Sequence, residues 1–126
     1  MKLEGSCHCG KVTFSVEAPE PWPYLRCYCS VCRKTGGGGG YAINLGARRA
    51  TLDLSGEEHL SVYDAFPDPE AKGEGKGRSF CRHCGSMLWN WDPRWPELIH
   101  PVASAIDTPL PTPPAAVHMM LDSRAT

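Results

Sequence analysis

The chain alternates apolar and polar residues in short stretches and shows no long helical repeat. In residues 11–17, Val12, Phe14 and Val16 are separated by polar side chains, a pattern typical of a half-buried strand. Further strands are predicted at residues 24–28, 41–45, 51–54, 59–63, 78–80, 86–91, 99–104 and 116–121. The sequence therefore predicts an all-β fold of short antiparallel strands.

Helical signals are sparse. The chain has 12 prolines and 13 glycines, which disfavour a helical bundle. One short helix is predicted at residues 30–35, with Ser30 as its N-cap. The proline-rich residues 107–114 predict an extended connector. Trp89 and Trp91 have the same parity in a predicted strand, so we expect them in the core or on one sheet face.

Length and charge limit the function classes. We expect residues 1–126 to form a single domain, because the chain is too short for two ordinary cores. The net charge of -1 offers no basic field for nucleic acid, and no apolar run is long enough to cross a membrane. We therefore expect no nucleic-acid or membrane partner, and cysteines held reduced for metal binding predict a cytoplasmic protein.

The seven cysteines fall into three tight groups: Cys7 and Cys9, then Cys27, Cys29 and Cys32, then Cys81 and Cys84. A disulfide framework is one interpretation of a small cysteine-rich chain. Three features oppose it: the odd count, the Cys-x-Cys spacing, which is too close for an unstrained disulfide, and the missing signal segment. Metal binding by reduced thiols is therefore the favoured interpretation.

The flanking residues divide the cysteines between two sites. Cys9 and Cys84 are each followed by glycine, which tolerates the positive φ of a tight turn after a metal ligand. The sequence therefore predicts one closed site formed by four thiolates: Cys7, Cys9, Cys81 and Cys84. Such a site closes a long loop and stabilises the fold when zinc is bound.

The remaining three cysteines, Cys27, Cys29 and Cys32, form a second candidate site without an obvious fourth thiolate. An open site of this kind is typical of catalytic zinc. The alternative is a second structural zinc completed by a histidine, for which the chain offers His8, His59, His83, His100 and His118. The five glycines at residues 36–40 fit either a flexible linker or a backbone surface that touches a ligand.

The three cysteine blocks carry a family resemblance. The segments GSCHCGKV at residues 5–12, CYCSVCRKTG at 27–36 and FCRHCGS at 80–86 resemble the signature blocks of the glutathione-dependent formaldehyde-activating enzyme family, which also contains centromere protein V. The resemblance extends from about Gly5 to the last predicted strand. It implies a β-tent fold, two zinc ions per chain, one structural and one catalytic, and the same division of the cysteines.

The implied activity is a carbon–sulfur lyase reaction that joins glutathione, or another small thiol, to formaldehyde or a related aldehyde. In that case Arg33 and Lys34 are expected to receive the carboxylates of glutathione, and the backbone of Thr35, Gly36 and Gly37 is expected to lie against its peptide. Two rival hypotheses remain. One is a zinc-stabilised binding module without catalysis, and the other is an enzyme on this scaffold with a different thiol or carbonyl substrate.

This sequence departs from the family pattern at its C-terminal end. Family members usually continue past the last strand into a tryptophan-containing tail, whereas this sequence ends at residues 124–126. We therefore expect this sequence to be truncated at its C-terminal end relative to those members.

Overall fold

The computed structural model describes every residue except 37, 71, 72 and 74. The described residues form short strands, one α-helix and four 3-10 turns. The strands are β1 (Lys2–Ser6), β2 (Thr13–Glu17), β3 (Leu25–Cys27), β4 (Ala42–Asn44), β5 (Ala47–Arg48), β6 (Asp53–Ser55), β7 (Leu60–Tyr63), β8 (Gly77–Cys81), β9 (Met87–Trp91), β10 (Leu98–Pro101) and β11 (Val117–Met119). The helix is α1 (Ser30–Gly36), and the turns are η1 (Arg49–Thr51), η2 (Glu57–His59), η3 (Ala103–Ala105) and η4 (Leu121–Ser123).

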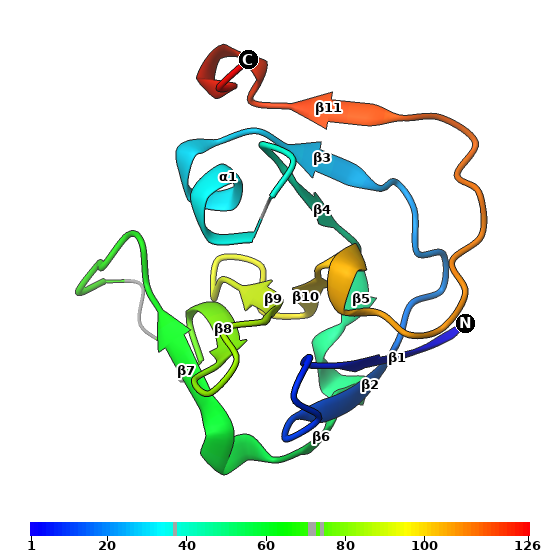
Figure 1. The fold of residues 1–126 in the computed structure, drawn as a ribbon, viewed down its shortest axis with the longest axis vertical. Coiled ribbons are helices and arrows are strands. Elements are labelled where there is room, and N and C mark those ends of the chain that lie inside the picture. The colour runs from blue at the N-terminus through cyan, green and yellow to red at the C-terminus, as the bar shows by residue number, and fades with distance from the viewer. Residues whose placement is uncertain (37, 71–72, 74) are drawn as a thin grey trace.

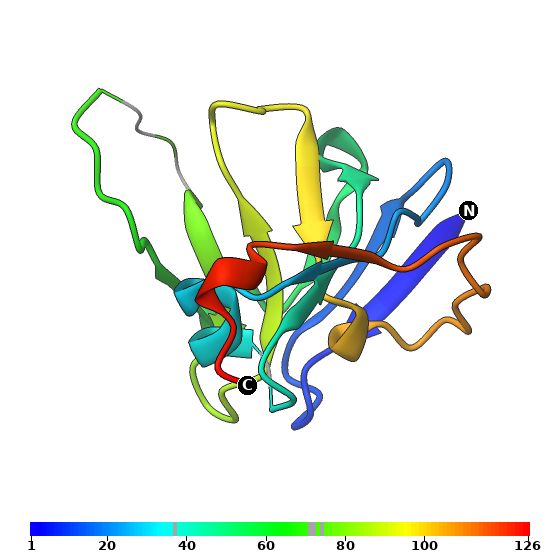
Figure 2. The same cartoon turned by 90° about the horizontal axis from the view of Figure 1, so that it is seen from above.

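The strands form three sheets with the orders β1-β2-β6, β5-β10-β9-β8-β7 and β11-β3-β4. In Figure 1 the five-stranded sheet lies between the other two, and α1 lies beside the sheet formed by β11, β3 and β4. Figure 2 shows β3 and β11 running across the strands of the five-stranded sheet. The C-terminal end of the chain lies near α1 in both views.

The predicted all-β fold is confirmed. All strand pairs are antiparallel except β11 with β3, which is parallel, with Met119 beside Cys27. The predicted helix is also confirmed and extends one residue further, to Gly36. Several strand ends differ from the prediction. The predicted strand at 99–104 ends at Pro101 and is followed by η3, and the one at 116–121 ends before Met120, whose φ is 60°.

Two strands were not predicted, β1 and β5. Only Leu3 supplies a buried apolar side chain within β1, and the other buried position is Gly5. A Cβ on Gly5 would lie 2.5 Å from Phe14 Cζ, so this glycine allows β1 to pack closely on the aromatic core. The sequence does not predict β1, because Gly5 stands where a second apolar residue would complete the alternating pattern.

The main core lies between the sheets. Leu3, Phe14, Leu88 and Ile99 belong to one buried cluster, and the rings of Phe14 and Trp89 meet edge to face with centroids 5.1 Å apart. The expected burial of Trp89 and Trp91 is confirmed, with 5% and 6% of each residue exposed. No helix in the described part of the chain is long and apolar enough to span a membrane.

Candidate metal and active site

The first candidate site joins two turns that are far apart in the sequence. Cys7 and Cys9 lie in the turn between β1 and β2, whereas Cys81 ends β8 and Cys84 follows it. Their four sulfurs all lie within 4.8 Å of one another, and we call this group the four-cysteine cluster. The Cys7–Cys9 and Cys9–Cys81 sulfur distances are 3.6 and 3.7 Å. Tetrahedral zinc with Zn–S bonds of about 2.3 Å places sulfurs about 3.8 Å apart, so this spacing fits zinc.

The two turns have matching backbone geometry. Gly10 and Gly85 both have a φ of 78°, the left-handed conformation that the Cys-Gly pairs predicted. The Gly10 N–H donates to the Cys7 carbonyl at 3.1 Å, and the Gly85 N–H donates to the Cys81 carbonyl at 2.8 Å. The Val12 N–H points at Cys7 Sγ at 3.3 Å. Both turns therefore present their sulfurs to a common centre.

Ser86 is a residue of this site that the sequence interpretation missed. Its Oγ lies 3.2 Å from Cys84 Sγ and accepts a hydrogen bond from the His8 N–H at 3.0 Å. The side chain thus links the two turns. Hydrogen bonds from the hydroxyl and the backbone N–H of Ser86 lower the pKa of Cys84 to about 5, which favours the thiolate that a metal requires.

The second candidate site is local in sequence. Cys27 ends β3, Cys29 precedes α1, and Cys32 lies in its first turn. Their sulfurs lie within 4.8 Å of one another, and we call this group the three-cysteine cluster. Cys27 and Cys32 are buried and Cys29 is half-buried. Among the described residues, no histidine, carboxylate or further cysteine joins this cluster.

The three thiols differ in their local environment. Burial raises the pKa of Cys27 to about 12. Burial also acts to raise the pKa of Cys29, but hydrogen bonds from the backbone N–H of Cys32 and from the neighbouring Cys27 and Cys32 thiols outweigh it and lower this pKa. The Cys32 N–H lies 3.3 Å from Cys29 Sγ. In the metal-free protein, Cys29 therefore carries negative charge more readily than Cys27.

The five histidines make other contacts. His59 Nδ1 lies 2.8 Å from His83 Nε2, and His118 Nδ1 lies 2.8 Å from the Tyr28 hydroxyl. His100 Nδ1 lies 3.0 Å from the Leu45 carbonyl, and the exposed His8 donates its backbone N–H to Ser86 Oγ. The geometry therefore does not favour a histidine as fourth ligand of the three-cysteine cluster.

Three polar residues near the three-cysteine cluster were missed at the sequence level. Arg78 Nη1 donates to Cys32 Sγ at 3.1 Å, and Asn44 Nδ2 lies 3.6 Å from the same sulfur. Asn90 Nδ2 donates to Asn44 Oδ1 at 3.4 Å. One signal in the sequence could have identified Asn90. It is a polar residue between two tryptophans, Trp89 and Trp91, in a strand that is otherwise apolar.

The expected thiol-binding residues fall on α1. Arg33 Nε is buried and has no hydrogen-bond partner among the described residues, whereas Lys34 is exposed. The Thr35 hydroxyl donates to the Val31 carbonyl at 2.6 Å. A Cβ on Gly36 would lie 2.6 Å from the sulfur of Met87, so the backbone here packs against β9. The remaining expected contact, Gly37, lies outside the described residues.

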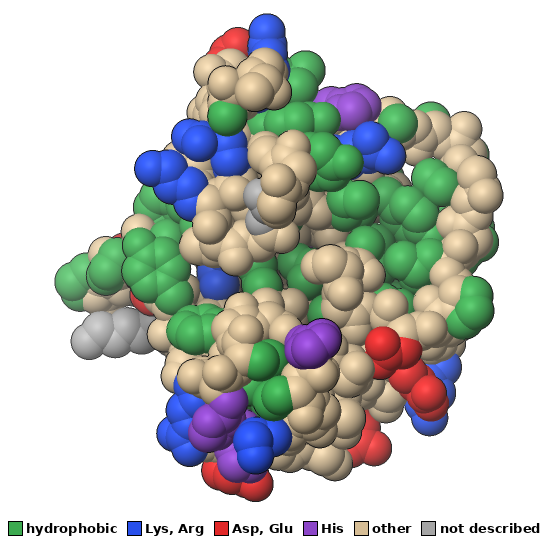
Figure 3. All heavy atoms as spheres, in the orientation of Figure 1, with side chains coloured by type: hydrophobic (Ala, Val, Ile, Leu, Met, Phe, Trp, Pro, Cys, Tyr) green, Lys and Arg blue, Asp and Glu red, His purple; other side chains and the backbone are tan. Residues whose placement is uncertain are grey.

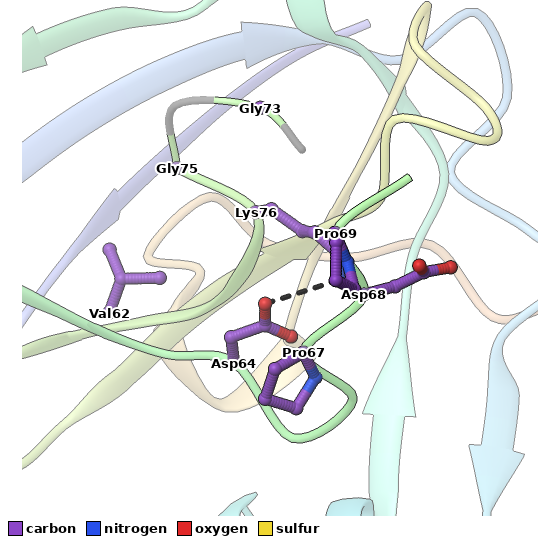
Figure 4. Close-up of a pocket in the computed structure, with 8 residues that line it drawn as sticks. All are labelled: Val62, Asp64, Pro67, Asp68, Pro69, Gly73, Gly75 and Lys76. Atoms are coloured by element: carbon purple, nitrogen blue, oxygen red, sulfur yellow. Dashed lines mark hydrogen bonds and ion pairs between the residues drawn. The ribbon is translucent and has the colours of Figure 1, made fainter. Parts of the chain in front are cut away.

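A group of cavities lies beside β7 and β8. The cavity in Figure 4 has a volume of about 520 Å³, and Lys76 Nζ lies 3.1 Å from Asp64 Oδ2 across it. A smaller cavity of about 140 Å³ shares these two residues and is also lined by Arg78 and Asn90. Arg78 therefore contacts Cys32 and also lines this smaller cavity.

The fold and these two clusters define a small all-β protein with two candidate thiolate metal centres. The model of the family described as "Glutathione-dependent formaldehyde-activating enzyme" matches residues 2–122. The chain belongs to the glutathione-dependent formaldehyde-activating enzyme family.

Two known proteins illustrate this relationship. A Halomonas elongata protein, provisionally named a glutathione-dependent formaldehyde-activating enzyme, is 58% identical over 125 residues, which are 98% of this chain and 78% of that protein. The crystal structure of a Rhodobacter sphaeroides protein superimposes with a TM-score of 0.69 at 32% identity, covering 94% of this chain and 98% of that one.

Proposed function

We propose that this protein is a zinc-dependent enzyme of the carbon–sulfur lyase type that adds glutathione, or another small thiol, to formaldehyde or a related aldehyde. The observation that carries the proposal is the three-cysteine cluster, which no fourth protein ligand joins among the described residues. Catalytic zinc sites keep a position for water or substrate, whereas structural sites use four protein ligands. The names of the family and of the Halomonas relative support glutathione and formaldehyde as substrates.

The two clusters have separate roles in this proposal. The four-cysteine cluster (Cys7, Cys9, Cys81 and Cys84) would hold a structural zinc ion, and the three-cysteine cluster (Cys27, Cys29 and Cys32) would hold a catalytic one. When bound at the second cluster, zinc lowers the pKa of a coordinated thiol and polarises an aldehyde oxygen. In the reaction the S–H bond and the carbonyl π bond break, a bond forms from the thiol sulfur to the carbonyl carbon, and the thiol proton ends on the aldehyde oxygen. No oxidant or reductant is consumed.

Basic side chains on α1 would orient the thiol substrate. Figure 3 shows Lys and Arg side chains gathered over the region of this helix. Arg33 has a buried Nε without a partner among the described residues, and a substrate carboxylate would supply the missing acceptor. Lys34 is exposed one residue further along and can meet a second carboxylate. Thr35 and Gly36 would contribute through their backbone, because the Thr35 hydroxyl already donates to the Val31 carbonyl and Gly36 has no side chain.

We further propose that residues 1–126 act as one domain and that the protein works in the cytoplasm. A reducing compartment keeps thiols available as metal ligands. The seven cysteines are all unpaired in this structure, which agrees with that setting.

Calorimetric titration of the zinc-loaded protein with glutathione tests the proposal. We expect glutathione to bind and its S-methyl derivative to bind far more weakly, because the methyl group blocks coordination through sulfur. Lys34→Glu should weaken binding, whereas Arg48→Glu, a charge reversal on the exposed end of β5, should not. Equal binding of both compounds would exclude sulfur coordination as the source of affinity. Absence of binding at millimolar concentration would favour a zinc-stabilised binding module.

A further inference from the structure

The side chain of Arg78 reaches the three-cysteine cluster from a different sheet. Arg78 lies on β8, directly opposite Asn90 on β9, so both side chains project from the same face of the five-stranded sheet. That face meets β4 and α1, where Arg78 Nη1 donates to Cys32 Sγ at 3.1 Å. Arg78 and Cys32 are 46 residues apart in the sequence. A charged group is thus placed against a sulfur with only 1% of its residue exposed.

Asn44 gives the same sulfur a second donor. Its Nδ2 lies 3.6 Å from Cys32 Sγ, and its Oδ1 accepts a hydrogen bond from Asn90 Nδ2 at 3.4 Å. The acceptor bond fixes the orientation of the Asn44 amide, so its N–H group faces the sulfur. Asn44 is itself buried, with 9% of the residue exposed. Arg78, Asn44 and Asn90 therefore form a connected polar network beside the three-cysteine cluster.

The negative charge of a metal-loaded three-cysteine cluster explains why this polar network would lie beside it. A divalent metal ion with three thiolates carries one net negative charge, and a fourth thiolate from a substrate would add another. Buried charge is unfavourable unless a partner compensates it. The guanidinium of Arg78 is permanently positive and donates directly to one of the three sulfurs. It can therefore offset this charge without occupying a ligand position.

We propose that Arg78 is a positioning residue of the three-cysteine site. Its guanidinium holds Cys32 in the ligand orientation and compensates the negative charge of the metal–thiolate centre, and Asn44, oriented by Asn90, supports it. This inference rests on the proposed binding of metal at Cys27, Cys29 and Cys32. Groups that contact metal ligands in this way commonly change metal affinity by about 10- to 100-fold when they are replaced.

Metal affinity and cadmium NMR of the full chain test this role. The wild type should bind two metal ions and give two cadmium resonances, one from each cluster. Arg78→Met should weaken metal binding at the three-cysteine cluster by about 10- to 100-fold in chelator competition and shift that resonance alone. Arg78→Lys keeps the positive charge but loses the planar guanidinium. Its metal affinity should therefore lie between those of the wild type and Arg78→Met. Arg48→Met removes an exposed charge elsewhere and should change neither site.

The outcomes separate this inference from the proposed function. If the wild type binds a single metal ion, both the catalytic zinc site and the role of Arg78 are overturned. If the wild type binds two ions and Arg78→Met retains affinity and both resonances, only the role of Arg78 is overturned. Equal shifts of both resonances would reveal a general loss of packing and would also contradict it. A selective change with partial rescue by lysine supports the proposal.

Discussion

Removal of one thiolate from each cluster should have very different effects on folding. We expect Cys81→Ser to prevent stable folding of the zinc-loaded protein and Cys29→Ser to leave it folded. Cys81 belongs to the cluster that joins the turn after β1 to the turn after β8, and it is fully buried. Cys29 is half-buried and belongs to a cluster that spans only residues 27–32.

The expected difference follows from the sizes of the loops that the clusters close. Cys9 and Cys81 are 72 residues apart, and the entropy that a cross-link over such a loop removes from the unfolded chain is worth about 4 kcal/mol of free energy at room temperature. The same relation gives about 2 kcal/mol for a loop of about six residues, such as that from Cys27 to Cys32. Structural zinc contributes on the order of 10 kcal/mol in small domains, which is comparable to the whole stability of an average domain.

Urea and thermal unfolding, followed by circular dichroism at one zinc concentration that exceeds both sites in every variant, measure this difference. Serine at the buried position 81 also leaves a hydroxyl without a partner, so Cys9→Ser is the appropriate second variant. Cys9 is exposed, and its replacement removes a ligand without burying a polar group. Cys9→Ser should therefore also be strongly destabilised. Equal stability of Cys29→Ser and both four-cysteine variants would refute the assignment of structural and catalytic sites.

Two further substitutions test the packing and the electrostatics. Gly36→Ala should lower the stability of the fold by about 1 kcal/mol, because the new Cβ would lie 2.6 Å from Met87 Sδ and the flexible but buried Met87 side chain would have to shift. Adding Met87→Ala should reduce the cost of Gly36→Ala in urea unfolding, and unchanged cost would contradict the steric explanation. Hydrogen bonding from Arg94 lowers the pKa of Asp92, so this pair should stabilise the fold above about pH 4 and lose that effect as the pH falls through the lowered pKa. The stability difference between wild type and Asp92→Asn should therefore shrink in acid, and a difference independent of pH would contradict this linkage.

The local parts of the fold were predictable from the sequence. Alternation in residues such as Val12, Phe14 and Val16 predicted β2, and the Cys-Gly pairs predicted the positive φ of Gly10 and Gly85. These signals lie within a few residues of the structure that they specify. The grouping of the sulfurs was also predictable. Cys9 and Cys84 are each followed by glycine, which indicates that these two turns share one site and leaves the other three cysteines to the second site.

The remaining features depend on contacts between distant segments. Nothing near Arg78 in the sequence indicates Cys32, because the contact requires β8 to face α1. The parallel pairing of β11 with β3 likewise joins segments more than eighty residues apart, and a short strand pattern does not encode its direction. Ser86 was missed for a related reason, since its bond to the His8 N–H forms only after the two cysteine turns have met.

The different spans of the two clusters set an order of events during synthesis. A growing chain has made every member of the three-cysteine cluster once Cys32 has emerged from the ribosome, and α1 can then form from neighbouring residues. The four-cysteine cluster must wait for Cys84, so Cys7 and Cys9 remain an incomplete pair while most of the chain is made. During that interval the thiols of Cys7 and Cys9 lack their two partners, and only the arrival of Cys81 and Cys84 completes the cluster.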